Sequence, residues 1–227
     1  AQLLNGAQRP LLIVGRGVHL SGAFRELKEL AEKANVPVVN TIHGTGAFPR
    51  HHALSLGMLG MHGTQAANLA VQQCDLLICL GARFDDRVTG NLQKFAPLAK
   101  VIHVDIDPDE IPRNYPVALG LMADVRTFLR QVLDSIAVRP EAVTLTDARR
   151  NWLAVIDDYK KKWAEFIAPG FSDNSSPIHP QRAVHEINKA VPDDTILVSD
   201  IGVHHNWLLQ FCNPKGPLSL IGSMGFG

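Results

Sequence analysis

Short apolar runs alternate with amphipathic stretches along most of the chain. Runs at 11–14, 36–39, 75–80, 100–105 and 117–121 are bounded by Gly, Pro or polar residues, which predicts buried strands. Between them, apolar residues at three- and four-residue spacing predict helices, namely one capped by Ser21 and others at 65–73 and 125–136. Strands and helices in this alternation predict right-handed crossovers and a Rossmann-like α/β domain with a parallel sheet.

The alternation breaks near residue 138 and then resumes. A long amphipathic helix is predicted at 146–166, and a linker rich in Pro, Gly, Ser and Asn follows at 169–177. A second α/β unit then begins, with a helix at 180–191, strands at 195–199 and 218–221, and a helix at 206–211. We therefore divide the chain into a domain at 1–140, a helix and linker at 141–177, and the start of a second domain at 178–227.

Composition narrows the functional classes. The chain has 227 residues, 46% of them hydrophobic, with 22 basic and 22 acidic side chains, so it is a core-forming protein without the positive charge typical of nucleic-acid binders. No apolar stretch approaches the roughly 20 residues of a membrane span. The cysteines, Cys74, Cys79 and Cys212, lie in apolar surroundings without a Cys-x-x-Cys pair, which favours buried thiols over metal or redox sites.

Polar and glycine residues follow several predicted strands. Gly15-Arg16-Gly17 after the first strand suits either close approach to a phosphate or simply a tight turn. The full G-x-G-x-x-G pattern is not met, and Asn40 ends the second strand where an NAD site has an acid. A standard NAD dehydrogenase is therefore disfavoured.

The exit loop at 81–87 carries Arg83, Asp85 and Arg87, which we interpret as ligand contacts rather than a surface ion-pair cluster. For Asp105 a ligand role is favoured, whereas for Asp107 a ligand role and a helix cap before Pro108 are equally plausible. The long segment 44–62 shows no periodicity and is predicted to be a functional loop. The histidine pair at 204–205 has no third residue at metal-ligand spacing, so a metal site is disfavoured.

Several segments in order resemble the catalytic large subunit of acetohydroxyacid (acetolactate) synthase, a thiamine-diphosphate-dependent enzyme. They are GMLGMHG at 57–63, CDLLICLGARFDDRVTG at 74–90, HVDIDP at 103–108, SDIGVHHNW at 199–207 and LIGSMGFG at 220–227. The resemblance implies a piece of a longer protein, made of the family's FAD-binding middle domain and the opening of its thiamine-diphosphate domain.

The resemblance also implies two sets of site residues. The FAD contacts would be Gly15, Arg16, Gly17, Thr41, Ile42, Leu59, Gly60, Met61, His62, Gly81, Ala82, Arg83, Asp85, Arg87, Val88, Asp105, Ile106, Asp124 and Val125. The thiamine diphosphate contacts would be Ile201, Gly202, Val203, His204, Gly222 and Met224. The chain departs from the family at Val203, where Gln is common, and at His205-Asn206, where the family commonly has Gln-Met.

No catalytic or metal-binding residue is expected within this chain, because the family's activating glutamate and its Mg²⁺ motif lie in segments outside it. The implied reaction decarboxylates pyruvate on thiamine diphosphate and transfers the hydroxyethyl unit to a second 2-ketoacid, in branched-chain amino-acid synthesis. The alternatives are another thiamine-dependent 2-ketoacid decarboxylase or carboligase, or a non-catalytic flavin- or nucleotide-binding module. The chain alone is expected to be inactive.

The resemblance further implies a homodimer or homotetramer, a small regulatory subunit as partner, and no nucleic-acid or membrane partner. The expected location is the bacterial cytoplasm, or a plastid or mitochondrion in a eukaryote.

Overall fold

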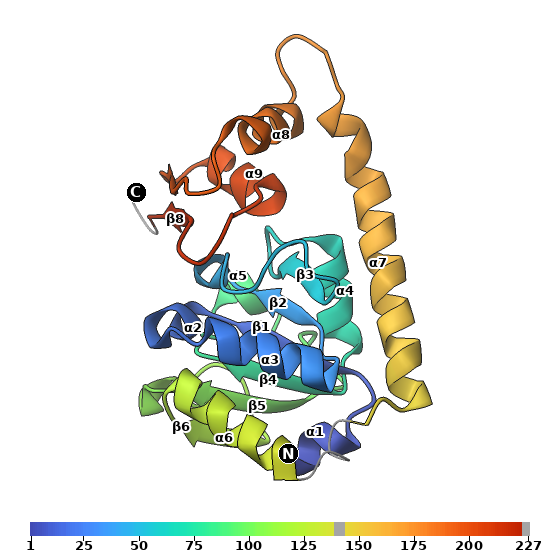
Figure 1. Ribbon diagram of the computed structural model, residues 1–227, viewed down its shortest axis with the longest axis vertical. Coiled ribbons are helices and arrows are strands. Elements are labelled where there is room, and N and C mark those ends of the chain that lie inside the picture. Colours follow the sequence, from blue (N-terminus) through green and yellow to red (C-terminus); the bar gives the residue numbers. More distant parts are fainter. Residues whose placement is uncertain (139–143, 224–227) are drawn as a thin grey trace.

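The computed structural model describes residues 1–138 and 144–223. Its larger part is a six-stranded parallel sheet in the order β3-β2-β1-β4-β5-β6 (Figure 1). This order is that of the doubly wound Rossmann fold, so the predicted α/β class is confirmed. The strands are β1 (Pro10–Val14), β2 (Val38–Asn40), β3 (Ser55–Met58), β4 (Leu76–Leu80), β5 (Lys100–Asp105) and β6 (Leu119–Met122).

Helices cover both faces of this sheet. The helices of the first unit are α1 (Gln2–Gly6), α2 (Arg16–Ser21), α3 (Phe24–Ala34), α4 (Gln65–Gln73), α5 (Asp86–Thr89) and α6 (Val125–Val138), with 3₁₀ turns η1 (Ile42–Gly44) and η2 (Pro108–Glu110). Helices α3 and α6 pack on one face, and α4 packs on the other together with the later helix α7 (Asp147–Phe171). Burial on both faces explains why the strands read as continuous apolar runs.

The alternation of side chains along β1 shows how one strand serves two cores. Leu12 and Val14 join the core formed with α3 and α6, whereas Leu11 and Ile13 join the core formed with α4 and α7. All four side chains are completely buried. Because successive side chains of a strand point to opposite faces, an unbroken apolar run is what a doubly covered strand requires.

Two local predictions for the first unit were wrong. The predicted loop at 44–62 contains β3, which is hard to recognise because Gly57 has a φ of +81° and the register shifts between Val38 and Val39 of its partner strand. Ser21 does not cap a helix; it ends α2, and its hydroxyl donates to the carbonyl of Gly17 at 2.7 Å. Gly22, at a φ of +62°, separates α2 from α3.

The long helix α7 runs alongside both units (Figure 1). It begins at Asp147, one residue after the predicted start at Thr146, and the Thr146 hydroxyl caps it by accepting from the amide of Arg149. Trp152 and Ile156 are buried against the sheet, and the Trp152 indole donates to the Pro10 carbonyl at 3.1 Å. The helix extends five residues beyond the predicted end at 166, so Pro169 and Gly170, which were expected in the linker, lie in its last turns.

The second unit is smaller. It contains α8 (Pro180–Ala190), β7 (Leu197–Ser199), α9 (Val203–Phe211) and β8 (Leu220–Gly222), with β7 and β8 paired in parallel. Helix α9 begins three residues earlier than predicted, so residues 203–205 are helical and only 200–202 form the exit loop of β7. Within residues 1–138 and 144–223, no helix combines the length and the apolar character that crossing a membrane would require.

Candidate functional site

The strand order creates a crevice at the carboxyl edge of the first sheet. Strands β1 and β4 are neighbours, but the chain leaves them toward opposite sides of the sheet, and such a switch point is where ligands bind in open α/β sheets. The Gly15 amide donates to the Leu80 carbonyl at 3.0 Å, and the Gly17 amide donates to the Gly81 carbonyl at 2.9 Å. The turns after β1 and β4 are therefore fixed against each other.

Glycine is required at this junction. A Cβ on Gly15 would lie 2.3 Å from the Gly81 carbonyl oxygen, and a Cβ on Gly17 would lie 2.6 Å from the Gly81 Cα. Gly81 itself has a φ of +56°. Gly60, at +95°, lets the segment after β3 approach Arg87, where a Cβ would meet the carbonyl oxygen at 2.3 Å. These approaches bring three backbone segments, the turns after β1 and β3 and the exit loop of β4, to one opening.

A cleft of about 400 Å³ lies at this edge. Most residues predicted as FAD contacts line it, namely Arg16, Gly17, Thr41, Ile42, Leu59, His62, Gly81, Ala82, Arg83, Asp85, Arg87, Val88, Asp105 and Ile106. The predicted residues Gly15, Gly60, Met61, Asp124 and Val125 do not line it, although Gly15, Gly60 and Val125 pack directly behind residues that do.

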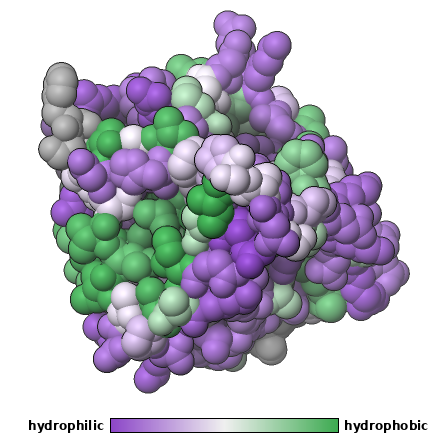
Figure 2. Space-filling view, turned by 90° about the horizontal axis from the view of Figure 1, so that it is seen from above, coloured by the Kyte–Doolittle hydropathy of each residue, from purple (hydrophilic) through white to green (hydrophobic). Residues whose placement is uncertain are grey.

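Five further residues line the cleft: Leu20, His43, Met58 and Glu110, which had not been named as contacts, and Asp107, for which a ligand role and a cap role had been equally plausible. Most of them sit at or just after strand ends, so the strand-exit rule could have found them. Met58 was not predicted as a contact because β3 was not recognised in the sequence. Figure 2 shows hydrophobic side chains gathered on the left of the view, the side on which α2, β6 and β8 lie in Figure 1. The apolar part of the cleft wall comes from Leu20, Ile42, Met58, Leu59, Ala82, Val88 and Ile106.

The exit loop of β4 is held from beneath by His103. Its Nε2 bonds the Ala82 carbonyl at 2.9 Å, and its ring packs edge-on against Phe84 at 5.0 Å between centroids. Burial lowers the pKa of His103, although the bond to Ala82 opposes this. The imidazole is therefore neutral at pH 7 and donates to the carbonyl. This support places the following Arg83 at the mouth of the cleft.

Three arginines line the cleft. The Arg83 Nε lies 3.5 Å from the Glu110 carboxylate, and an Arg87 Nη lies 3.6 Å from the Met61 sulfur. Arg83 and Arg87 keep 69% and 59% of their side chains exposed, so both can turn toward a ligand. Burial lowers the pKa of His43, and the positive charges of Arg16 and Arg83 lower it further. The charge of Asp85 opposes these two arginines, and the cleft as a whole is lined by three arginines and four acids, Asp85, Asp105, Asp107 and Glu110.

The predicted acidic contacts also serve the local backbone. Asp85 caps α5 by accepting from the Val88 amide at 3.0 Å, and Asp107 caps η2 by accepting from Asp109 at 3.0 Å. Asp105 accepts from the Asp107 amide, and Asp124 accepts from the Thr127 amide at 2.9 Å. For Asp107 the helix-cap interpretation is thus observed, while it also lines the cleft. The other three combine a turn or cap role with their place near the cleft.

The donor set of the cleft fits a dinucleotide such as FAD. Guanidinium groups match phosphate oxygens, apolar walls from Ile42, Met58 and Val88 suit a flat ring, and the glycine turns allow a ligand to approach the backbone. Any Cβ at Gly15 or Gly17 would disturb this arrangement. Among the described residues, no group of three or more His, Cys, Asp or Glu side chains is placed to hold a metal ion.

A second cluster lies at the carboxyl ends of β7 and β8. Of the predicted thiamine diphosphate contacts, Ile201, Gly202, Val203 and His204 are exposed and Gly222 lies beside them across the sheet. Met224 lies outside the described residues. Sequence reasoning missed His205 as part of this cluster. Its Nδ1 is 3.0 Å from the Ser199 hydroxyl, and a Cβ on Gly222 would lie 2.2 Å from its Cε1.

The pKa of His205 depends on its burial and on neighbouring histidines from both units. Burial lowers the pKa of His205, and the charges of His204, His43 and His62 lower it further. His43 and His62 line the cleft of the first unit. A neutral His205 is therefore favoured at pH 7.

Comparison with known proteins agrees with the Rossmann-like α/β fold. Residues 1–132 match the family described as thiamine pyrophosphate enzyme, central domain. The chain is 40% identical over its whole length to the probable acetolactate synthase large subunit of Methanocaldococcus jannaschii, covering 39% of that protein. It is 42% identical over 99% of its length to the acetolactate synthase large subunit of Parasynechococcus marenigrum, covering 36% of it. An acetolactate synthase of Mycobacterium bovis is 40% identical, with 36% covered.

Proposed function

Because the chain belongs to the thiamine pyrophosphate enzymes, with residues 1–132 as the central domain of that family, we propose that it forms part of an acetolactate synthase large subunit. The chain spans about two fifths of the length of the relatives it matches, which carry that name. In this proposal the first unit holds FAD, and the second unit supplies part of the wall around thiamine diphosphate and its Mg²⁺.

The observation that carries the proposal is the cleft at the switch point. It combines close glycine turns, three arginines and apolar walls at one sheet edge. An acidic residue for an adenosine ribose, as NAD enzymes have after the second strand, is replaced here by Asn40. Asn40 instead donates to the Thr45 hydroxyl at 3.0 Å and fixes the turn after β2. These features favour a flavin with a structural role over a nicotinamide that transfers hydride.

The proposed reaction joins two 2-ketoacids. Pyruvate loses CO₂, and its remaining hydroxyethyl unit is transferred to a second 2-ketoacid to give an acetohydroxyacid. Thiamine diphosphate supplies, when bound, the nucleophilic carbon and the electron sink for this chemistry. The residues of this chain bind and orient: Arg83 and Arg87 neutralise phosphate charge, and the exit loop at 200–202 lies beside Gly222 where the second cofactor would approach.

Titration of the chain with FAD tests the cofactor. We expect saturable quenching of flavin fluorescence, and we expect Arg83→Met to weaken binding about ten-fold, the loss typical of a charge-assisted contact. Arg113→Met is the matched control, because Arg113 pairs with the same Glu110 oxygen at 3.1 Å but does not line the cleft. Absence of FAD binding, or equal weakening by both variants, would contradict the assignment.

A chimera tests the activity. The segment of the Methanocaldococcus jannaschii relative that matches this chain is replaced by residues 1–227, and the product is assayed with pyruvate, thiamine diphosphate, Mg²⁺ and FAD. We expect acetolactate formation. A folded chimera that binds FAD and makes no acetolactate would refute the proposed reaction.

A second candidate reaction rests on Val203. Its side chain is 63% exposed at the start of α9, where the family commonly has an amide. An apolar residue there cannot hydrogen-bond to a polar substrate or cofactor group, so the substrate range can differ. The alternative is therefore another thiamine-dependent 2-ketoacid decarboxylase or carboligase. A panel of 2-ketoacids separates the two, because release of free aldehyde in place of acetohydroxyacid would favour the alternative.

Assembly belongs to the same proposal. The intact enzyme is expected to form a homodimer or larger assembly and to accept a small regulatory subunit. Light scattering of the chimera gives the oligomeric state, and an active monomer would contradict this part.

A further inference from the structure

The carboxyl end of α9 is fastened to the first unit by Arg50. This residue precedes β3, and its Nη1 donates to the Leu209 carbonyl at 3.1 Å while its Nη2 donates to the Gln210 carbonyl. The last carbonyls of a helix have no partner within the helix and carry partial negative charge. A partly buried cation at this position therefore stabilises both the helix end and the contact between the units. Arg50 and Leu209 are 159 residues apart in sequence.

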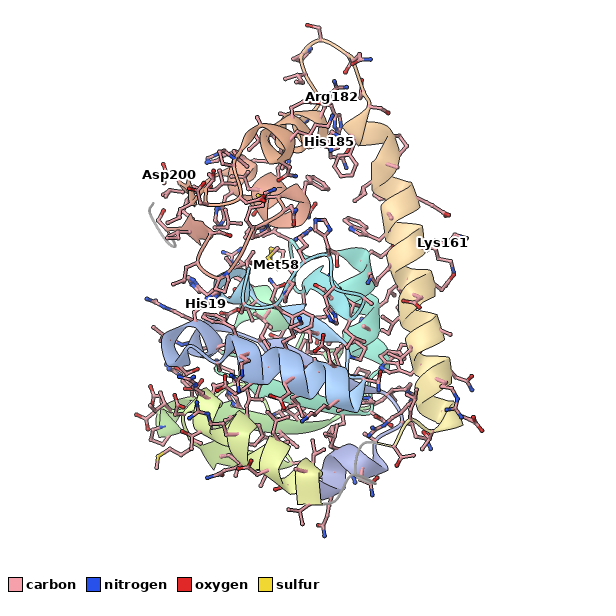
Figure 3. The ribbon with its side chains drawn as sticks, in the orientation of Figure 1. His19, Met58, Lys161, Arg182, His185 and Asp200 are labelled. Atoms are coloured by element: carbon pink, nitrogen blue, oxygen red, sulfur yellow. The ribbon has the colours of Figure 1, made fainter. Side chains whose placement is uncertain are left out.

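The same helix end contacts two walls of the cleft. The side-chain amide of Gln210 donates through its Nε2 to the backbone carbonyl of His62 at 2.8 Å. Met58 is 1% exposed and packs with Leu209 and Leu220 in one small apolar cluster. Both Met58 and His62 line the cleft. Figure 3 shows Met58 between the first sheet and the second unit, beneath α9.

The other end of α9 begins at the second cluster. Val203 is its first residue, and His205 joins the helix to Ser199 and Gly222. The helix has nine residues, which is about 13 Å at 1.5 Å per residue. A helix this short moves as one body. Any restraint on the motion of Leu209 and Gln210 therefore also restricts the motion of residues 203–205.

We propose that Gln210 and Arg50 are positioning residues that couple occupancy of the cleft to the order of α9 and of the exit loop at 200–202. The inference rests on the proposed FAD site. A ligand against Met58 and His62 restricts the segment that Gln210 holds, so the bond from Gln210 to His62 opens less often. Ordering by one ligand lowers the cost of ordering for the next, which is positive cooperativity between the two cofactor sites.

Hydrogen exchange of the whole chain tests the coupling. Exchange of the amides at 203–211 is followed by mass spectrometry with and without saturating FAD. We expect FAD to slow exchange about two- to ten-fold, the range that one hydrogen bond supports. Gln210→Met keeps the side-chain volume but removes the donor, so FAD should still bind and the slowing should disappear.

Asn188→Ala is the matched control. Asn188 donates to the Phe211 carbonyl at 2.9 Å and accepts from the Asn213 amide at 2.8 Å, so it holds the same helix end from within the second unit. This variant should raise exchange of α9 with and without FAD, and the slowing by FAD should remain. Arg50→Lys replaces the two guanidinium nitrogens that bind the Leu209 and Gln210 carbonyls by a single ammonium group. This variant should reduce the FAD-dependent slowing of exchange, as Gln210→Met does.

The outcomes separate the two proposals. If FAD does not bind the unsubstituted chain, the proposed flavin site is wrong. If FAD binds and exchange of α9 does not change, the flavin site stands and the coupling is overturned. The coupling is also overturned if Gln210→Met retains the full effect of FAD. Coupling between two sites is reciprocal. The factor by which Gln210→Met weakens FAD binding should therefore equal the factor by which FAD slows exchange of α9 in the unsubstituted chain.

Discussion

Glu26 should contribute measurable stability that depends on pH, and Glu26→Gln should remove it. This carboxylate is 5% exposed on α3, and its Oε1 accepts from the Arg126 Nε at 2.8 Å and from the Arg130 Nε at 3.0 Å on α6. Burial alone raises the pKa of Glu26, but the hydrogen bonds from both arginines outweigh it and lower the pKa to about 2. The interaction therefore joins the two helices that cover one face of the sheet.

The magnitude follows from the pKa. The difference between the ordinary value of 4.5 and about 2 corresponds to at most about 3.4 kcal/mol in favour of the folded state. The Arg126 and Arg130 side chains are 45% and 58% exposed, so water screens the pairs and a contribution of about 1–2 kcal/mol is expected. Because the folded pKa is lowered, this stability is present above about pH 4.5 and is lost as pH falls toward about 2.

Urea unfolding at several pH values measures the effect. At pH 7, Glu26→Gln should lower the free energy of unfolding by about 1–2 kcal/mol. The gap between variant and unsubstituted chain should narrow steadily below about pH 4.5. Glu29→Gln is the control, because Glu29 lies on the same helix but forms a half-exposed i,i+4 bridge with Lys33, worth about 0.3–0.5 kcal/mol. Equal losses for both variants, or a gap that stays constant down to about pH 3, would refute the reasoning.

Three further outcomes are expected. Gly81→Ala should weaken FAD binding at least about ten-fold in a fluorescence titration, because its Cβ would meet the Gly17 Cα at 2.5 Å; unchanged affinity would show that the turn is not the binding surface. Trp152→Phe should lower the free energy of unfolding by about 1–3 kcal/mol in urea, because the Pro10 carbonyl loses its donor, and a loss below about 0.5 kcal/mol would contradict this. Burial raises the pKa of the Cys74 thiol to about 12, so a thiol reagent at pH 8 should label none of the buried cysteines before urea is added and all of them afterwards; rapid labelling of the folded chain would contradict their burial. The three thiols are Cys74, Cys79 and Cys212.

The residues of the cleft could be recognised from sequence to the extent that they follow strand ends. Arg83 and Arg87 follow a five-residue apolar run, and the rule that ligands meet the carboxyl edge pointed to them without any structure. Met58 was missed because β3 contains Gly57 at positive φ and shows no alternation. His43 lies in η1 after β2, at a recognised strand exit from which only Thr41 and Ile42 had been named. His205 was missed because its contacts with Ser199 and Gly222 depend on the pairing of β7 with β8.

The sequence by itself determined most of the strands and helices, with β3 the main exception, because apolar periodicity and turn residues act over a few neighbouring positions. It also determined the class of the fold, since buried strands joined by helices have few ways to form a sheet. Only the tertiary structure decided the order β3-β2-β1-β4-β5-β6 and hence the switch point between β1 and β4. It alone placed Arg50 on the end of α9 and Gln210 on His62, because these contacts join residues about 150 positions apart. Such contacts arise from the packing of whole units, which no local pattern of residues encodes.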